Sequence, residues 1–198
     1  MLNMNYVSLL QSVFKDSDYL LKPLNKTQMF EIMKWRNDQI ENLRQSKVLT
    51  KKDQINYYQN IILPSLKENY PQNILLGISY KKKFIGYGGL VHIDWENRNA
   101  EVSFLVNTKI LKKYNSYVRH QKHFMAVLKK ISFEDLNLKK IYAVTFGFRN
   151  KKDVKALEAS GFKYEASLKN FLKYNGSFHD IIYHSIENSI MESKKIKQ

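Results

Sequence analysis

The sequence predicts a mixed α/β fold in which a mostly antiparallel sheet of six or seven strands is flanked by about four helices. Three observations support this class. Residues 84–106 read FIGYGGLVHIDWENRNAEVSFLV, two extended segments around a polar reversal, and the second alternates between two faces as strands do. Asn175-Gly176 is the strongest short signal for a second hairpin. Apolar residues at helical spacing from Val118 to Ile131 indicate a long helix.

The N-terminal half begins with an amphipathic extension, residues 1–17, which we expect to dock as a helix. A strand follows at 19–24, and Asn25 or Thr27 can cap the first helix. The second helix begins at Thr50, with Asp53 as its capping-box partner. A strand at 73–80 and a polar turn then lead into the hairpin described above, so this half contributes one strand, two helices and three antiparallel strands.

The C-terminal half continues with a loop, a helix, a strand, a second helix and two more strands. Their expected bounds are 107–116 for the loop, about 118–136 for the helix, 140–146, 152–160 and then 162–173 and 178–186. Gly161 is a typical helix C-cap residue. We therefore expect one domain over residues 18–187, and a frayed basic tail over residues 188–198.

The composition restricts the partners and the location. The net charge of +15 favours anionic ligands, although the lysines are scattered in pairs as on a solvated surface, and nucleic acid is an unlikely partner because no recognisable motif is present. The chain has no cysteine and no apolar run long enough to span a bilayer. Its first residues lack the pattern of a signal peptide. We expect a cytoplasmic protein without membrane insertion, as a monomer or homodimer.

Several local motifs in this order resemble the GNAT acetyl-coenzyme A transferases, in particular the branch of ribosomal-protein and amino-sugar N-acetyltransferases. The resemblance covers about residues 18–187 and rests on segments reading WRN, IGYGGLVHIDW, AEVSFL, FEDLNL and ALEASGF, followed by Asn175-Gly176 and Asp180. It implies direct transfer of an acetyl group from acetyl-CoA to an amine. It also implies that strands 100–106 and 140–146 diverge, and that an edge formed by Phe104, Leu105 and Val106 offers backbone groups to the pantetheine arm.

The sequence departs from that family where the pyrophosphate should bind. The usual glycine-rich loop before the long helix is replaced by LKKYNSYVRH, which contains no glycine. The helix N-terminus near Asn115 and Ser116 would still supply N–H donors, and Arg119 or a neighbouring lysine would supply charge. Arg149 and Asn150, which precede the last helix, are further candidates for cofactor contact; the alternative is ordinary loop polarity.

Acetyl transfer needs a route for the amine proton. Glu101 matches a strand position that is often acidic in this branch, and His92 lies near it across the hairpin, so the resemblance implies catalytic roles for both. The alternatives are a strand carboxylate paired with a lysine and a structural histidine. The tyrosine that protonates the leaving thiolate in many relatives corresponds to Leu157, so that role is vacant.

The acceptor pocket of similar enzymes is lined by the segment that here contains Arg36 and Asn37, and Trp95 can form a stacking wall or close the core. Arg36 can bind a phosphate in bidentate fashion. No metal is expected, because His120 and His123 lack a third ligand.

We therefore expect an acetyl-CoA-dependent N-acetyltransferase acting on a small amine such as a nucleotide-linked amino sugar. Two alternatives stay open: an acetyltransferase acting on protein N-termini or lysines, and a non-catalytic protein that binds acidic ligands or nucleic acid on the same scaffold.

Overall fold

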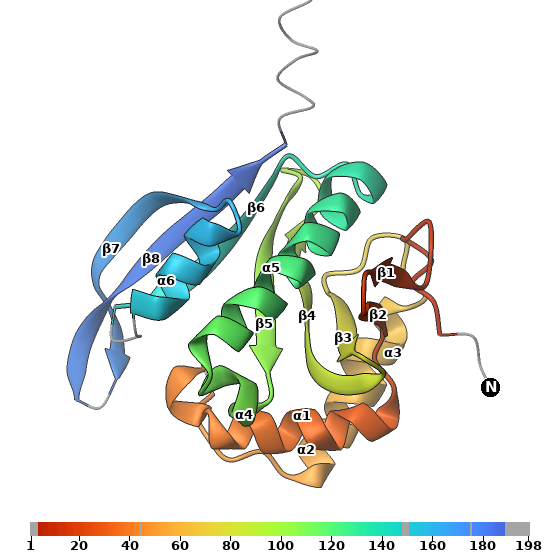
Figure 1. Cartoon of the computed structure of the whole chain (residues 1–198), viewed down its shortest axis with the longest axis horizontal. Coiled ribbons are helices and arrows are strands. Elements are labelled where there is room, and N and C mark those ends of the chain that lie inside the picture. The colour runs from red at the N-terminus through yellow and green to blue at the C-terminus, as the bar shows by residue number, and fades with distance from the viewer. Residues whose placement is uncertain (1–3, 44, 148–150, 175, 189–198) are drawn as a thin grey trace, which may run out of the picture.

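A single sheet organises the molecule. The computed structural model describes residues 4–43, 45–147, 151–174 and 176–188, and within them eight strands hydrogen-bond in the order β1-β2-β3-β4-β5-β6-β8-β7 (Figure 1). The strands are β1 (Phe14–Asp16), β2 (Tyr19–Pro23), β3 (Ile74–Tyr80), β4 (Lys83–Asp94), β5 (Asn99–Val106), β6 (Lys140–Phe146), β7 (Lys163–Tyr174) and β8 (Ser177–Glu187). Every neighbouring pair is antiparallel except β5 and β6, which are parallel.

Helices pack on both faces of this sheet. They are α1 (Lys26–Asp38), α2 (Lys51–Tyr57), α3 (Leu63–Ser65), α4 (Thr108–Leu111), α5 (Tyr114–Lys130) and α6 (Lys151–Ala159), with short turns η1 (Ile40–Asn42), η2 (Tyr58–Ile62) and η3 (Ile131–Asp135). The mixed α/β prediction is confirmed. The capping boxes at Asn25 and Thr50 are present as well, each closed by the residue three positions on.

The alternation in β5 sorts its side chains into two cores. Ala100 and Val102 pack with Phe124 and Leu128 of α5, whereas Leu105 packs with residues of α1 and η2 on the opposite face. Both faces of β5 are therefore covered, and the strand is held in the middle of the molecule. The long α5 crosses in front of the sheet in Figure 1, and α1 and α2 lie along its lower end.

The N-terminal segment differs from the expected docked helix. Residues 4–17 contain no helix, and Phe14–Asp16 adds an edge strand instead, which raises the sheet from the expected six or seven strands to eight. The cause is the anchoring of Tyr6, whose buried hydroxyl donates to the C=O of Leu75 at 3.1 Å and accepts from its N–H at 2.8 Å. These long-range bonds fix the segment in turns and bends that lead into the short strand β1, in place of the helix that its periodicity favours.

The expected loop at 107–116 is mostly helical. Asn107 caps α4 by accepting a hydrogen bond from the N–H of Ile110 at 3.0 Å, and α5 then begins at Tyr114. The helix at the other end gives way at Ile131 to a π-helical turn. Two expected features lie outside the described residues. These are residues 189–198, which form most of the expected tail, and Asn175 of the expected hairpin turn.

The glycines of β4 mark a close approach between backbones. A Cβ atom at Gly88 would lie 2.4 Å from the C=O oxygen of Ser103 and 2.7 Å from the ring of Phe124. At Gly89, whose φ is +154°, it would lie 1.8 Å from the C=O oxygen of Ile74. Only glycine fits between the two neighbouring strands here.

The hairpin ladder breaks at His92. Pairing of β4 with β5 passes from Val91–Glu101 directly to Asp94–Asn99, and His92 takes a left-handed backbone conformation with φ +51°. A residue with a Cβ atom is strained there, at a cost on the order of 1 kcal/mol. Such strain persists only where the surrounding structure imposes it, and it turns the His92 side chain toward the same cavity that Glu101 lines.

This strain predicts a reversed order of stability at position 92. His92→Gly should be more stable than His92→Ala by about 1 kcal/mol, because glycine accepts the left-handed conformation and alanine does not. Urea unfolding of both variants measures the difference. Equal stability, or a more stable alanine variant, would show that the backbone at this position is not strained.

A group of aromatic and histidine side chains, remote from the hairpin turn, holds α5 against the sheet near β2. His120 is buried, and its Nδ1 lies 2.7 Å from the hydroxyl of Tyr19; Tyr80, Arg119 and His123 surround it. Desolvation, followed by repulsion from Arg119 and His123, lowers the pKa of His120 to about 4. The imidazole is therefore neutral in the folded protein at pH 7.

This shift predicts loss of stability in acid. The pKa of His120 is about 4 in the folded protein and about 6.5 in the unfolded chain. Above pH 6.5 the imidazole is neutral in both states, so its burial does not lower the free energy of unfolding. As the pH falls from 6.5 toward 4 the unfolded chain takes up the proton first, and this costs on the order of 1–2 kcal/mol by pH 5. His120→Gln should flatten the dependence of unfolding free energy on pH over this range. An unchanged slope would remove His120 as its source.

Candidate functional site

An opening between β5 and β6 forms the centre of the site. The two strands pair only through Asn99–Glu101 and Lys140–Tyr142, although β5 continues to Val106 and β6 to Phe146. Beyond this short contact β5 stays with β4, and β6 stays with β8 along its full length. The sheet therefore splits into two halves at Glu101, as the resemblance predicted.

A cavity of about 280 Å³ occupies this opening. It reaches both faces of the sheet, because its lining includes Glu101 and Ser103 from one face of β5 and Val102 and Phe104 from the other. The helical side is closed by Tyr117, Gln121 and Met125 of α5 and by Asp153 and Leu157 of α6. His92 and Arg36 complete the lining on the hairpin side.

The opening continues as a groove toward the turn between α4 and α5. A second cavity, of about 290 Å³, is lined by Phe104, Leu105, Val106, Lys112 and Tyr114. The two cavities share part of their walls, namely Asn42, Leu43, Phe104, Tyr117 and Asp153. A single elongated ligand can therefore run from the N-terminus of α5 to Glu101.

The exposed edge of β5 supplies alternate backbone groups to this groove. The N–H of Asn107 donates to Ile85 of the hairpin at 2.9 Å, so in an antiparallel ladder Leu105 also faces β4, while Phe104 and Val106 face the opening. The C=O of Val106 already accepts from the side chain of Gln39 at 2.9 Å. Of the three residues predicted to contact the cofactor, Phe104 and the N–H of Val106 therefore face the opening, whereas the backbone groups of Leu105 face β4.

The first turn of α5 lies at the far end of the groove. Lys113 occupies its N-cap position, and no side chain caps the turn. The first N–H groups of a helix have no partner within the helix, so the N–H groups of Asn115 and Ser116 can be offered to an anion. Lys112 lines the same end of the groove. Backbone donors are therefore present without the expected glycines.

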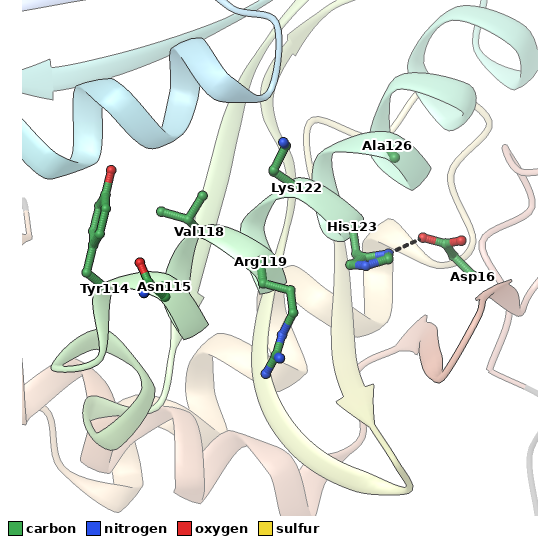
Figure 2. A pocket seen from close by; sticks show the side chains of 8 residues that line it. All are labelled: Asp16, Tyr114, Asn115, Val118, Arg119, Lys122, His123 and Ala126. Carbon is green, nitrogen blue, oxygen red and sulfur yellow. Dashed lines mark hydrogen bonds and ion pairs between the residues drawn. The ribbon is translucent and has the colours of Figure 1, made fainter.

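Two predicted residues lie on the outer face of α5. Asn115 and Arg119 line a broad hollow of about 620 Å³, together with Lys122 and His123 (Figure 2). Across this hollow His123 Nδ1 lies 2.6 Å from the carboxylate of Asp16. Arg119 lies over the ring of Tyr80, 5.6 Å from its centroid. The side chains of Asn115 and Arg119 thus lie outside the groove lining, while Tyr114 lines both spaces.

The structure brings the two candidate catalytic residues together. His92 Nε2 lies 4.0 Å from Glu101 Oε2, at the end of the opening where the sheet is still closed. The side chain of His92 is 68% exposed, whereas that of Glu101 is 14% exposed. The cross-strand proximity inferred from the sequence is present, and the break in the ladder at His92 brings the imidazole over the carboxylate.

Leu157 lines the opening and is buried. It offers no ionisable group there. Among the described residues that line this cavity, Tyr117 is the only tyrosine, and it lies on α5 rather than α6.

Arg36 lies between this cavity and a third one beneath α1 and α2. Its Nη1 donates to the hydroxyl of Tyr87 at 2.8 Å, and its Nε donates to Gln45 at 3.0 Å. Both partners are neutral. In the described part of the chain no carboxylate lies within ion-pair distance of Arg36.

The other predicted site residues have structural contacts. The amide of Asn37 bonds to both backbone groups of Leu49, at 2.9 Å each, and accepts from Gln45, so it fastens the segment before α2. Trp95 donates to the C=O of Pro71 at 3.0 Å and packs on the core at the hairpin end. Neither lines the cavities described above. Arg149 and Asn150 lie outside the described residues.

Sequence reasoning missed two glutamines. Gln54 and Gln121 are each at least nine-tenths buried and line cavities, and in each the Oε1 atom has no hydrogen-bond partner among the described residues. Their only signal in the sequence is a polar residue at a position of the helical pattern that faces the sheet.

Comparison with known proteins agrees with this geometry. Residues 21–183 match the acetyltransferase (GNAT) domain family. The provisionally named ribosomal N-acetyltransferase YdaF of Bacillus subtilis (strain 168) is 26% identical over 140 residues, which cover 70% of this chain and 73% of that protein.

Two solved structures show the same fold. Spermidine N-acetyltransferase from Vibrio cholerae, in complex with CoA and spermine, superposes with a TM-score of 0.70 at 21% identity and covers 88% of this chain and 98% of that one. Ribosomal-protein-S5-alanine acetyltransferase from Vibrio fischeri gives 0.69 at 20% identity, covering 90% and 98%.

None of the helices in the described residues is long and apolar enough to cross a membrane. The match over residues 21–183, on a sheet that splits between β5 and β6, shows that this chain belongs to the GNAT acetyltransferase family and is an acyltransferase.

Proposed function

We propose that the protein transfers an acetyl group from acetyl-CoA to a primary amine at the closed end of the β5–β6 opening. The observation that carries this proposal is the continuous groove from the uncapped turn of α5 to the His92–Glu101 pair. Backbone groups at the edge of β5 suit an extended, amide-containing ligand along the groove, and the first turn of α5 suits an anion at one end.

The cofactor arm would pair with the free edge of β5. The backbone groups of Phe104 and the N–H of Val106 face the groove, so pantetheine amides can add to this edge as a further strand would. The N–H groups at the start of α5 and the ammonium of Lys112 would hold the pyrophosphate. Asn115 and Ser116 then contribute through their backbone, and Arg119 from the outer face would contact only parts of the cofactor that leave the groove.

The reacting amine would lie beside Glu101 and His92. A neutral amine attacks the thioester carbonyl, the new C–N bond forms, the C–S bond breaks, and CoA leaves as the thiolate. The amine proton passes to Glu101, directly or through water, and His92 lies near enough to share it. Leu157 cannot protonate the thiolate, so that proton comes from elsewhere.

The acceptor would carry an anionic group. Arg36 borders the reaction end of the opening, and no carboxylate of the described residues lies within ion-pair distance of its guanidinium. A guanidinium binds phosphate in bidentate fashion, which supports a nucleotide-linked amino sugar. The similar proteins act on other amines, since their names specify spermidine and a ribosomal protein. We therefore infer the class of acceptor from the charge of Arg36 and not from the substrates of the similar proteins.

Removal of the carboxylate tests the proposed chemistry. Glu101→Gln should lower kcat for acetyl transfer by about 10²-fold or more while the Kd for CoA stays within about two-fold, because the amide keeps the shape but cannot accept the proton. Glu96→Gln, at an exposed position in the same hairpin, is the matched control and should behave as the unmodified protein. Release of free thiol from acetyl-CoA measures turnover, and calorimetry measures CoA binding.

The acceptor panel for this assay contains a nucleotide-linked amino sugar, spermidine and an alanyl peptide. No thiol release with any of them, combined with no calorimetric binding of CoA, would refute an acetyltransferase. Turnover with the peptide alone would assign a protein acceptor instead.

A further inference from the structure

A separate cavity of about 280 Å³ lies beneath α1 and α2 and adjoins the reaction site. It shares Arg36, Val91 and Ser103 with the β5–β6 opening, so its inner end meets the place where the amine would react. Its remaining walls are mostly apolar and come from α1, β3 and β4. Pockets for drug-sized ligands measure about 300–1,000 Å³, so this one suits a single ring rather than an extended chain.

Gln54 supplies a polar group to this cavity that the fold does not use. Its side chain is only 4% exposed, and its Oε1 atom has no hydrogen-bond partner in the described part of the chain. Leaving a buried amide without a partner destabilises a protein, so such a group points to a ligand or to ordered water. Gln54 follows the capping-box residue Asp53 on α2, so a rigid helix holds it in place.

Two further polar groups converge on the same space. No hydrogen bond is found for the hydroxyl of Tyr57 within the described residues, and the hydroxyl of Tyr87 has Arg36 as its hydrogen-bond donor. Desolvation, with a smaller contribution from Tyr87, raises the pKa of Tyr57 to about 12, so this phenol remains a donor at neutral pH.

The acidic residue in the lining does not offset Arg36. The carboxylate of Asp53 accepts from the N–H and the hydroxyl of Thr50, at 2.8 and 2.7 Å, and pairs with Lys47 at 3.3 Å. Its negative charge is thus used within the start of α2. The cavity therefore presents the Arg36 cation, the Gln54 acceptor and the hydroxyls of Tyr57 and Tyr87 on a mostly apolar wall.

We propose that this cavity binds the non-reacting part of the acceptor next to the amine, and that this part is a compact, hydroxyl-bearing ring with an anionic group. Gln54 accepts from a hydroxyl of the ligand, Tyr57 donates to a ring or hydroxyl oxygen, and Arg36 binds the anion. This assignment rests on the proposed acetyl transfer for the position of the amine. A polyamine offers no anion to Arg36 and no acceptor to Tyr57, so it would bind poorly.

A matched pair of glutamine variants tests the assignment. Gln121 is 3% exposed, has an unpartnered Oε1 among the described residues, and lines the opening on the α5 side, where the pantetheine arm would pass. Gln54→Leu should weaken binding of glucosamine 1-phosphate to the protein–CoA complex at least ten-fold and leave CoA binding unchanged. Gln121→Leu should do the reverse, weakening CoA and sparing the sugar phosphate. Isothermal titration calorimetry measures both ligands without turnover.

A stability measurement separates a ligand contact from a structural one. Gln54→Leu should raise the midpoint of thermal unfolding of the free protein, because it removes a buried carbonyl oxygen that has no partner among the described residues. A lower midpoint would show that the amide makes a bond needed by the fold, and would overturn the assignment.

Three further outcomes distinguish the proposed subsite from the proposed function. Sugar phosphate binding that is absent, unaffected by Gln54→Leu, or matched by spermidine would overturn the proposal. Acetyl transfer to an amino sugar with Gln54-independent binding would keep the proposed function and remove the subsite. Gln54-dependent binding without any acetyl transfer would keep the subsite and remove the function.

Discussion

The short contact between β5 and β6 is the constraint on which the rest of the site depends. Three residues of each strand pair, and then β5 follows β4 while β6 follows β8. Each strand has satisfied one of its edges with an antiparallel neighbour, so the other edge must be covered by something that is not part of the sheet. The helices α5 and α6 cover the sides of the gap but do not fill it, and a groove results.

Under the proposed function, the same split would let two ligands meet from opposite faces. Val102 and Phe104 of β5 point toward α5, whereas Glu101 and Ser103 point toward α1 and α2, where Arg36 and Gln54 lie. The break in the ladder at His92 adds an imidazole at the meeting point, in a backbone conformation that costs stability. Under the proposed function, a carboxylate, an imidazole and a guanidinium would meet the reacting groups at this point.

Much of this arrangement could be predicted because local signals agreed with the tertiary structure. The capping box at Thr50, the alternation of β5 and the proximity of His92 to Glu101 all follow from spacing along the chain. The expected N-terminal helix was wrong because a distant contact decides the outcome: Tyr6 bonds to Leu75, and the segment forms turns and a short strand. The binding role of Asn37 stays a prediction, beside the hydrogen bonds by which it holds Leu49. The Oε1 atoms of Gln54 and Gln121 have no partner among the described residues. The sequence could not predict this, since an unused hydrogen-bonding group is recognised only once its neighbours are placed.

We propose that the free edge of β5 and the first turn of α5 hold acetyl-CoA together. Amide hydrogen exchange, followed by NMR with and without CoA, measures this directly at individual residues. We expect slower exchange at the N–H groups of Phe104, Val106, Asn115 and Ser116 when CoA is bound, and no change along the distant edge strand β7. Protection that leaves Phe104 and Val106 unaffected, with CoA bound, would show that the cofactor does not occupy the opening between β5 and β6.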